Sequence, residues 1–97
     1  METIANALVV TRHASLVEYL GVIGLIDDSA TVLSHATADD IRGGDVIGVL
    51  PHSLSCLTAS FTEVPLRIPA EMRGVELTVD NITEYAESPV TYIVNIK

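Results

Sequence analysis

The sequence predicts an α/β fold with an open, mostly parallel sheet flanked by helices. Three observations support this prediction. Short apolar runs of strand length alternate with segments whose apolar residues have helical spacing, and the connections between them are short. The apolar residues, 48% of the chain, include only three Tyr and one Phe. A core of Val, Ile, Leu and Ala suits strands that are covered by helices on both faces.

The first strand and the first helix follow each other closely. Ile4–Val10 is an apolar run of strand length. In Ser15–Ile23 the apolar residues recur at helical spacing, and the stretch "SLVE" fits a capping box. In such a box Ser15 would be the N-cap and the side chain of Glu18 would reach back to the backbone of Ser15.

Two further strands are predicted in the middle of the chain. Thr31–Ser34 forms the second strand and Asp45–Leu50, "DVIGVL", forms the third. Between them, residues 37–45 carry Asp39, Asp40 and a Gly pair. This composition is typical of a turn.

The second half of the chain continues the alternation. Residues 51–60, "PHSLSCLTAS", are predicted to be helical, with a proline near the first turn. Val64–Ile68 is the expected fourth strand, and residues 69–74 can form one helical turn that Gly74 ends.

Thr78 is expected to cap a last helix over Val79–Glu87, which Pro89 ends, and Val90–Ile96 is the last predicted strand. Strands that alternate with helices over such short connections indicate a Rossmann-like sheet. Residues 1–97 are expected to form a single domain. A chain this short buries a modest core, so we also expect self-association as a homodimer.

Charge and cysteine content exclude several functions. The net charge of −8 argues against DNA binding and against binding to a membrane surface. Cys56 is the only cysteine and is expected to be a small, buried helix residue. No spacing of ligands indicates a metal site, and no cofactor is expected. The start of the chain lacks the apolar run of a signal peptide, which predicts a cytoplasmic protein.

Two predicted loops lie where open α/β sheets bind their ligands, at the carboxyl ends of strands. They are Thr11–Ser15 and Leu50–Ser53. The backbone amides at a helix start attract anions, and the planar guanidinium of Arg12 suits a phosphate. Together these features predict a phosphate-binding site.

The three histidines receive different predictions. His13 is the first candidate for acid–base chemistry, because it lies beside Arg12 at a strand end, and His52 in the partner loop is the second. His35, at the end of the second strand, is expected to be a structural or surface residue.

Three stretches taken together resemble a known family: "VVTRHASLVEYL", "GDVIGVLP" and "RIPAEMRGVELT". The chain is similar to the small accessory proteins of type III CRISPR systems that are assigned as stand-alone ring nucleases. The similarity runs from about Leu8 to the helix after Thr78. Ile68 stands where this family usually has a leucine.

The resemblance implies that the protein linearises a cyclic oligoadenylate, with cyclic tetra-adenylate as the expected ring, and so ends antiviral signalling. A homodimer would match the two-fold symmetry of that ring. The residues expected at this site are His13, Arg12 and His52 for catalysis, and Thr11, Ser15, Pro51, Ser53 and Arg73 for ligand binding. Arg73 could equally pair with Glu71 or Glu76.

Two other functions fit the same residues. A module that binds the cyclic nucleotide, or that regulates another CRISPR protein without catalysis, would use the same arginines. A small α/β subunit with an apolar dimer face would bind no ligand.

Overall fold

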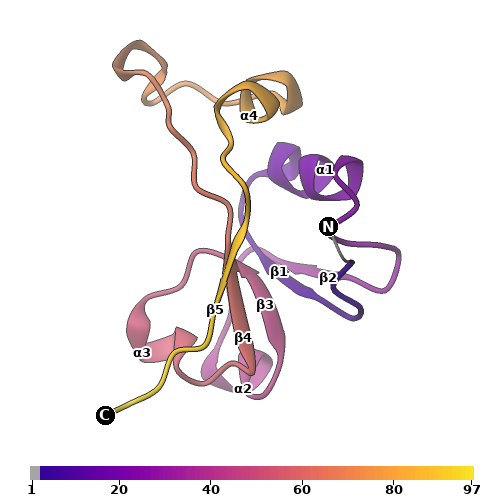
Figure 1. Cartoon of the computed structure of the whole chain (residues 1–97), viewed down its shortest axis with the longest axis vertical. Coiled ribbons are helices and arrows are strands. Elements are labelled where there is room, and N and C mark those ends of the chain that lie inside the picture. Colours follow the sequence, from indigo (N-terminus) through magenta and orange to yellow (C-terminus); the bar gives the residue numbers. More distant parts are fainter. Residues whose placement is uncertain (1–2) are drawn as a thin grey trace.

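The computed structural model describes residues 3–97. It contains a five-stranded sheet with the order β2-β1-β3-β4-β5. Strands β1 to β4 are parallel to one another, and β5 is antiparallel to β4. The predicted α/β fold with a mostly parallel sheet and flanking helices is confirmed (Figure 1).

The strands are shorter than the apolar runs that predict them. Their bounds are β1 Leu8–Val10, β2 Thr31–Leu33, β3 Asp45–Gly48, β4 Ser60–Glu63 and β5 Val90–Tyr92. In the parallel pairing Val10 lies opposite Leu33 on one side and opposite Gly48 on the other. The ends of β1, β2 and β3 are therefore level with one another.

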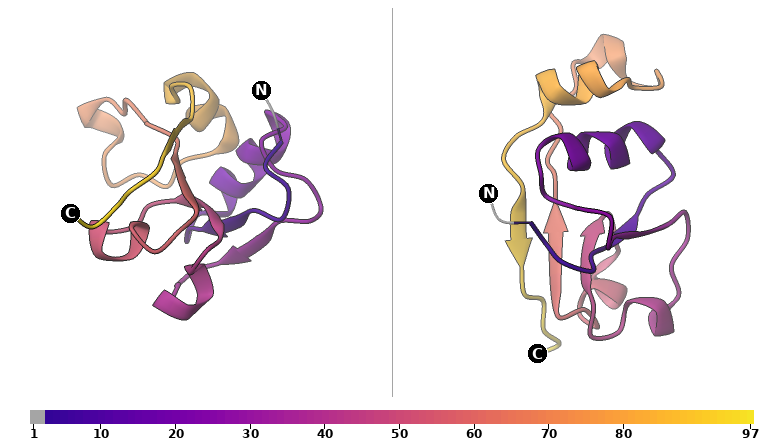
Figure 2. Two further views of the ribbon diagram at one scale, coloured as in Figure 1. Left: turned by 60° about the horizontal axis from the view of Figure 1, so that its bottom comes forward. Right: turned by 90° about the vertical axis from the view of Figure 1, so that its right-hand side faces the viewer.

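The helices are α1 Ala14–Val22, α2 Ala38–Ile41, α3 His52–Ser55 and α4 Val79–Tyr85, with a 3₁₀ turn, η1, at Ala70–Met72. In Figure 1, α1 and α4 lie at one end of the view and α2 and α3 at the other. Figure 2 shows the same separation from the side, with α4 beyond α1. Helix α4 contacts α1.

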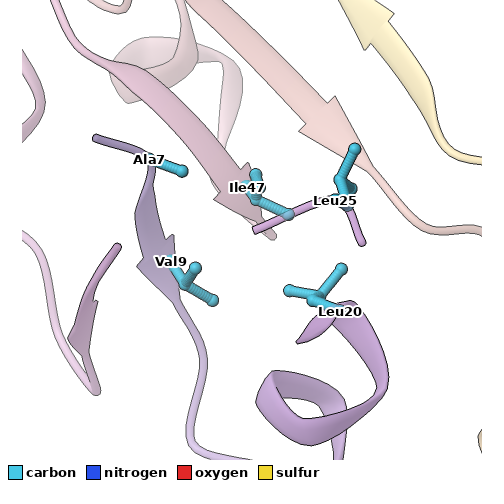
Figure 3. Close-up of a cluster of buried hydrophobic side chains, with 5 residues drawn as sticks. All are labelled: Ala7, Val9, Leu20, Leu25 and Ile47. Atoms are coloured by element: carbon cyan, nitrogen blue, oxygen red, sulfur yellow. The ribbon is translucent and has the colours of Figure 1, made fainter. Parts of the chain in front are cut away.

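Helix α1 covers one face of the sheet. Leu20, which is fully buried, packs against Val9 of β1 and Ile47 of β3, and Ala7 and Leu25 complete this cluster (Figure 3). Removing an aliphatic side chain of this size from water contributes about 2 kcal/mol. This burial explains why the helical spacing in residues 15–23 predicts α1 correctly.

A second cluster lies on the opposite face, because successive residues of a strand point to opposite sides. Val10 and Val46 pack there against Ile41 of α2 and Phe61 of β4. Leu54 of α3 is packed against the same cluster. Short helices thus cover this second face.

The start of α1 differs from the prediction. The N-cap is His13 rather than Ser15, and within residues 3–97 its side chain makes no capping hydrogen bond. Ser15 is the second residue of the helix, so it forms no capping box with Glu18. The helix begins earlier because the chain turns directly after β1, where the backbone N–H of His13 donates to Oγ1 of Thr11 at 3.1 Å.

Residues 37–45 contain a short helix, α2, where the sequence predicts a turn. Thr37 and Asp40 form a capping box: the backbone N–H of Asp40 donates to Oγ1 of Thr37, and the Asp40 carboxylate accepts from the backbone N–H of Thr37. The N–H and hydroxyl donors of Thr37 lower the pKa of the Asp40 carboxyl. The acidic residues that indicate a turn therefore start a helix instead.

The region after β3 also differs from the prediction. Helix α3 ends at Ser55, well short of residue 60, and Cys56 is its half-buried C-cap. The fourth strand lies at Ser60–Glu63, where Phe61 pairs with Val46, rather than at Val64–Ile68. Pro65 explains the failure, because proline has no N–H for the hydrogen bonds of a strand.

Residues 64–77 form a segment that we name the arm. It leaves the sheet after β4 and reaches away from it before α4 (Figure 1). At its base, Leu66 forms an isolated antiparallel bridge with Ala86. The backbone N–H of Glu87 donates to the carbonyl of Pro65 at 2.8 Å, and that of Arg67 to the carbonyl of Tyr85 at 2.9 Å.

The last two elements follow the prediction more closely. Thr78 caps α4 as predicted, with its hydroxyl oxygen accepting from the backbone N–H of Asn81 at 3.2 Å. The last strand begins at Val90 as predicted but ends at Tyr92 rather than Ile96.

Candidate functional site

The strand order defines a switch point between β1 and β3. From β1 the chain passes to β2 on one side, and from β2 it crosses to β3 on the other side of β1. The connections that follow β1 and β3 therefore lead in opposite directions. In open α/β sheets this arrangement leaves a space for ligands outside the carboxyl ends of the two strands.

A cavity of about 360 Å³ lies at this point, and we name it the switch-point crevice. Its walls come from the loops that follow three strands: Thr11–His13 after β1, Ser34–Ala36 after β2, and Val49–Pro51 after β3. Leu54 of α3 also lines it. The crevice is large enough for a phosphate group with its sugar.

Arg12 and His35 meet across the crevice. The Arg12 Nη2 atom lies 3.0 Å from Nε2 of His35. The same atom lies 3.5 Å from Nδ1 of His35, and because a guanidinium only donates hydrogen bonds, a ring nitrogen of His35 is the acceptor. His35 thus holds the Arg12 guanidinium in a fixed orientation.

The turn that carries Arg12 is fixed by backbone bonds. The N–H of Thr11 donates to the carbonyl of Leu33 at 3.0 Å, which extends the β1–β2 pairing beyond the strand ends. The hydroxyl oxygen of Thr11 accepts from the backbone N–H of His13. The residues before and after Arg12 are therefore both held by hydrogen bonds. The sheet itself therefore sets the position of this turn.

Gly48 lets β1 and β3 approach each other beside the crevice. Its φ of 141° lies in the region that favours glycine. A Cβ atom built on it would lie 2.1 Å from the carbonyl oxygen of Val10. No side chain fits at this position without moving one of the two strands.

A larger cavity of about 790 Å³ lies between the start of α1, the arm and α4, and we name it the arm cleft. Its apolar walls are formed by Leu16, Leu66, Ile68, Met72, Val75, Leu77 and Ile82. Its polar groups are His13, Ser15, Arg73 and Glu76. His13 lines both cavities, so the two meet at this residue.

The predicted site residues are distributed over these two cavities. Thr11, Arg12, His13 and Pro51 line the switch-point crevice. Ser15 and Arg73 line the arm cleft.

Two predicted residues, His52 and Ser53, line neither cavity; both are exposed on the first turn of α3. No ion pair between Arg73 and Glu71 or Glu76 is found within residues 3–97.

His35 is not among the predicted site residues, although it contacts Arg12. The register between β1 and β2 contains the reason for this contact. Val10 lies opposite Leu33, and Arg12 and His35 each follow two residues later. Equal spacing from the ends of two neighbouring parallel strands could have identified the pair, had the strand order been known.

Among residues 3–97, no three His, Cys, Asp or Glu side chains are grouped closely enough to hold a metal ion. The same residues include no helix with both the length and the apolar character needed to cross a membrane.

These features define a small α/β protein in which Arg12, His13 and His35 gather at the switch point of the sheet. Residues 8–95 match the family model described as "Putative CRISPR-associated protein (Cas_VVA1548)", and the chain belongs to this family. No curated protein and no solved structure matches the chain.

Proposed function

We propose that this protein is a ring nuclease of type III CRISPR systems that binds and linearises a cyclic oligoadenylate, with cyclic tetra-adenylate as the expected substrate. The membership in a CRISPR-associated family supports the biological setting. The observation that carries the proposal is the Arg12–His35 pair beside His13 in the switch-point crevice.

The proposed reaction needs no metal and no added water. The ribose 2′-oxygen attacks the adjacent phosphorus, and the bond from phosphorus to the 5′-oxygen breaks. The products are a 2′,3′-cyclic phosphate and a free 5′-hydroxyl. One proton leaves the 2′-hydroxyl and one proton reaches the 5′-oxygen, so the step is balanced.

The residues of the crevice would have separate roles in this step. The Arg12 guanidinium would stabilise the charge that develops on the phosphoryl oxygens. His13, at the junction of the two cavities, is the first candidate for proton transfer. His35 acts as a positioning residue, because its Nε2 is already occupied by Arg12.

We further propose that a homodimer acts on the ring. Four arginines and one lysine face thirteen acidic residues in the chain. Two copies would contribute Arg12 twice to one ligand and would match the two-fold symmetry of cyclic tetra-adenylate. Local positive potential in the shared site would then outweigh the net negative charge.

The first test is to incubate the purified protein with cyclic tetra-adenylate in EDTA and to resolve the products by chromatography and mass. We expect linear di- or tetra-adenylate that ends in a 2′,3′-cyclic phosphate. The Arg12→Gln variant should lose about a hundredfold or more in rate. Arg42→Gln, at an exposed arginine that pairs with Asp39, is the matched control and should retain the rate.

Two histidine variants then assign the proton transfer. His13→Ala is expected to lose about a hundredfold or more in rate while still binding the ring. A loss in His52→Ala instead would transfer the role to His52. A ring that is bound by the wild-type protein but stays intact would contradict the nuclease and support the alternative, a non-catalytic cyclic-oligoadenylate-binding or regulatory module.

A further inference from the structure

The arm cleft has no role in the proposed reaction, although it adjoins the crevice. The crevice, with about 360 Å³, has room for a phosphate and its sugar, whereas the cleft encloses about 790 Å³. Because His13 lines both cavities, a nucleotide bound with its phosphate against Arg12 would lie next to the opening of the cleft.

The walls of the cleft suit a flat apolar group rather than a second phosphate. Leu16 of α1, Met72 of the arm and Ile82 of α4 contribute apolar side chains from three separate segments. Ile82 is only 2% exposed, so its part of the wall belongs to the folded core. These three side chains offer an anion no hydrogen bond in exchange for its lost hydration, whereas they pack well against an apolar face.

The polar groups of the cleft suit the edge of a base. Arg73 supplies donors and Glu76 supplies an acceptor, and both lie on the arm. A nucleobase has two apolar faces and an edge that carries both donors and acceptors. Aliphatic contact with the faces, together with a few polar groups at the edge, is the usual composition of a small-molecule site.

We infer that the arm cleft binds an adenine base of the nucleotide whose phosphodiester lies against Arg12 in the crevice. This inference rests on the proposed function and adds a base-binding subsite to it. It assigns to the arm a role in ligand recognition, with Met72 as a wall of the subsite.

The test measures binding of cyclic tetra-adenylate that carries 2′-O-methyl groups, which block attack by the 2′-oxygen. Isothermal titration is carried out with the wild-type protein and two variants that add the same charge. Met72→Glu places a carboxylate in the wall of the cleft and should weaken binding about tenfold or more. Val22→Glu, at a 71% exposed residue that lines neither cavity, should change affinity by less than about twofold.

A second measurement needs no variant and so does not depend on the folding of Met72→Glu. The wild-type protein is titrated with the corresponding 2′-O-methyl cyclic tetra-uridylate, which has the same phosphates and different bases. We expect it to bind about tenfold more weakly than the adenylate, because the smaller pyrimidine leaves part of the apolar wall uncovered.

The outcomes separate the two proposals. Equal binding of both rings, or equal affinity of Met72→Glu and Val22→Glu for the adenylate, would overturn the base subsite and leave the nuclease proposal standing. A wild-type protein that binds neither ring and leaves unmodified cyclic tetra-adenylate intact would overturn both. Preference for the adenylate together with a selective loss in Met72→Glu supports the subsite.

Discussion

The two cavities that meet at His13 are built in different ways. The walls of the switch-point crevice are loops that leave three paired parallel strands, and Gly48 packs directly against Val10 beside them. The outer wall of the arm cleft is a segment that is joined to the end of α4 by backbone bonds at its base. The geometry of the crevice therefore depends on the whole sheet, whereas that of the cleft depends on local bonds that can be removed one at a time.

The largest effect should come from adding a side chain to the sheet at the crevice. Gly48→Ala combines a backbone conformation that strains any L-residue with a Cβ atom 2.1 Å from the Val10 carbonyl oxygen. We expect a loss of about 4 kcal/mol in the free energy of unfolding, measured by urea denaturation.

An exposed glycine of α1 provides the control. Gly21 lies in α1, and a Cβ atom there would meet nothing within 4 Å. Gly21→Ala should therefore stabilise the protein by about 0.5–1 kcal/mol, since alanine favours a helix. Equal effects of the two substitutions would contradict the role assigned to Gly48.

A smaller effect is expected where the arm joins α4. Thr78→Ala removes the hydroxyl that accepts from the backbone N–H of Asn81 and should cost about 1 kcal/mol of unfolding free energy. Thr83→Ala is the control in the same helix, because its hydroxyl only donates to the carbonyl of Val79. If the cleft depends on this end of the arm, Thr78→Ala should also weaken ring binding, and Thr83→Ala should not.

The ion pair at the base of the arm should contribute less. Arg67 and Glu87 pair there, with side chains that are 80% and 44% exposed. Arg67→Gln should cost about 0.5 kcal/mol or less of unfolding free energy at low salt, and the difference should vanish in about 1 M salt. A cost above about 2 kcal/mol would show that the arm is held by more than its backbone bonds.

The smallest effect concerns Asp40 in the helix that follows β2. Its carboxyl pKa lies below the ordinary value of 3.8, first because of the backbone N–H of Thr37 and second because of the Thr37 hydroxyl. Since the folded-state pKa is lowered, this contribution to stability is present above pH 3.8 and is lost as the pH falls through the lowered value. Thr37→Ala removes only the second cause.

A carboxyl ¹³C NMR titration should therefore show the pKa of Asp40 rising part of the way to its ordinary value in Thr37→Ala. An unchanged pKa would mean that the backbone N–H alone sets it.

The sequence predicts the parts of the fold that local patterns determine. The apolar run ending at Val10, the helical spacing around Leu20 and the cap at Thr78 all lead to the elements that they indicate. It fails at β4, because Ser60–Glu63 contains a single apolar residue, Phe61, and becomes a strand through its pairing with Val46. That pairing depends on the order of strands, which no local pattern contains.

The same distinction applies to the candidate site. Arg12 and His13 can be selected from the sequence because a strand end followed by a helix start places them at a sheet edge. The contact between Arg12 and His35 requires the adjacency of β1 and β2. The cleft requires the path of the arm in three dimensions, so the sequence identifies Arg73 as a candidate without indicating its surroundings.

The Arg12–His35 hydrogen bond also has an entropic consequence. A free arginine side chain loses about 2 kcal/mol of rotamer freedom when a ligand immobilises it. Arg12 gives one of its five N–H groups to His35 and thereby loses much of this freedom before any ligand arrives. Four donors remain for an anion, and the affinity that they provide is reduced little by the cost of ordering the side chain.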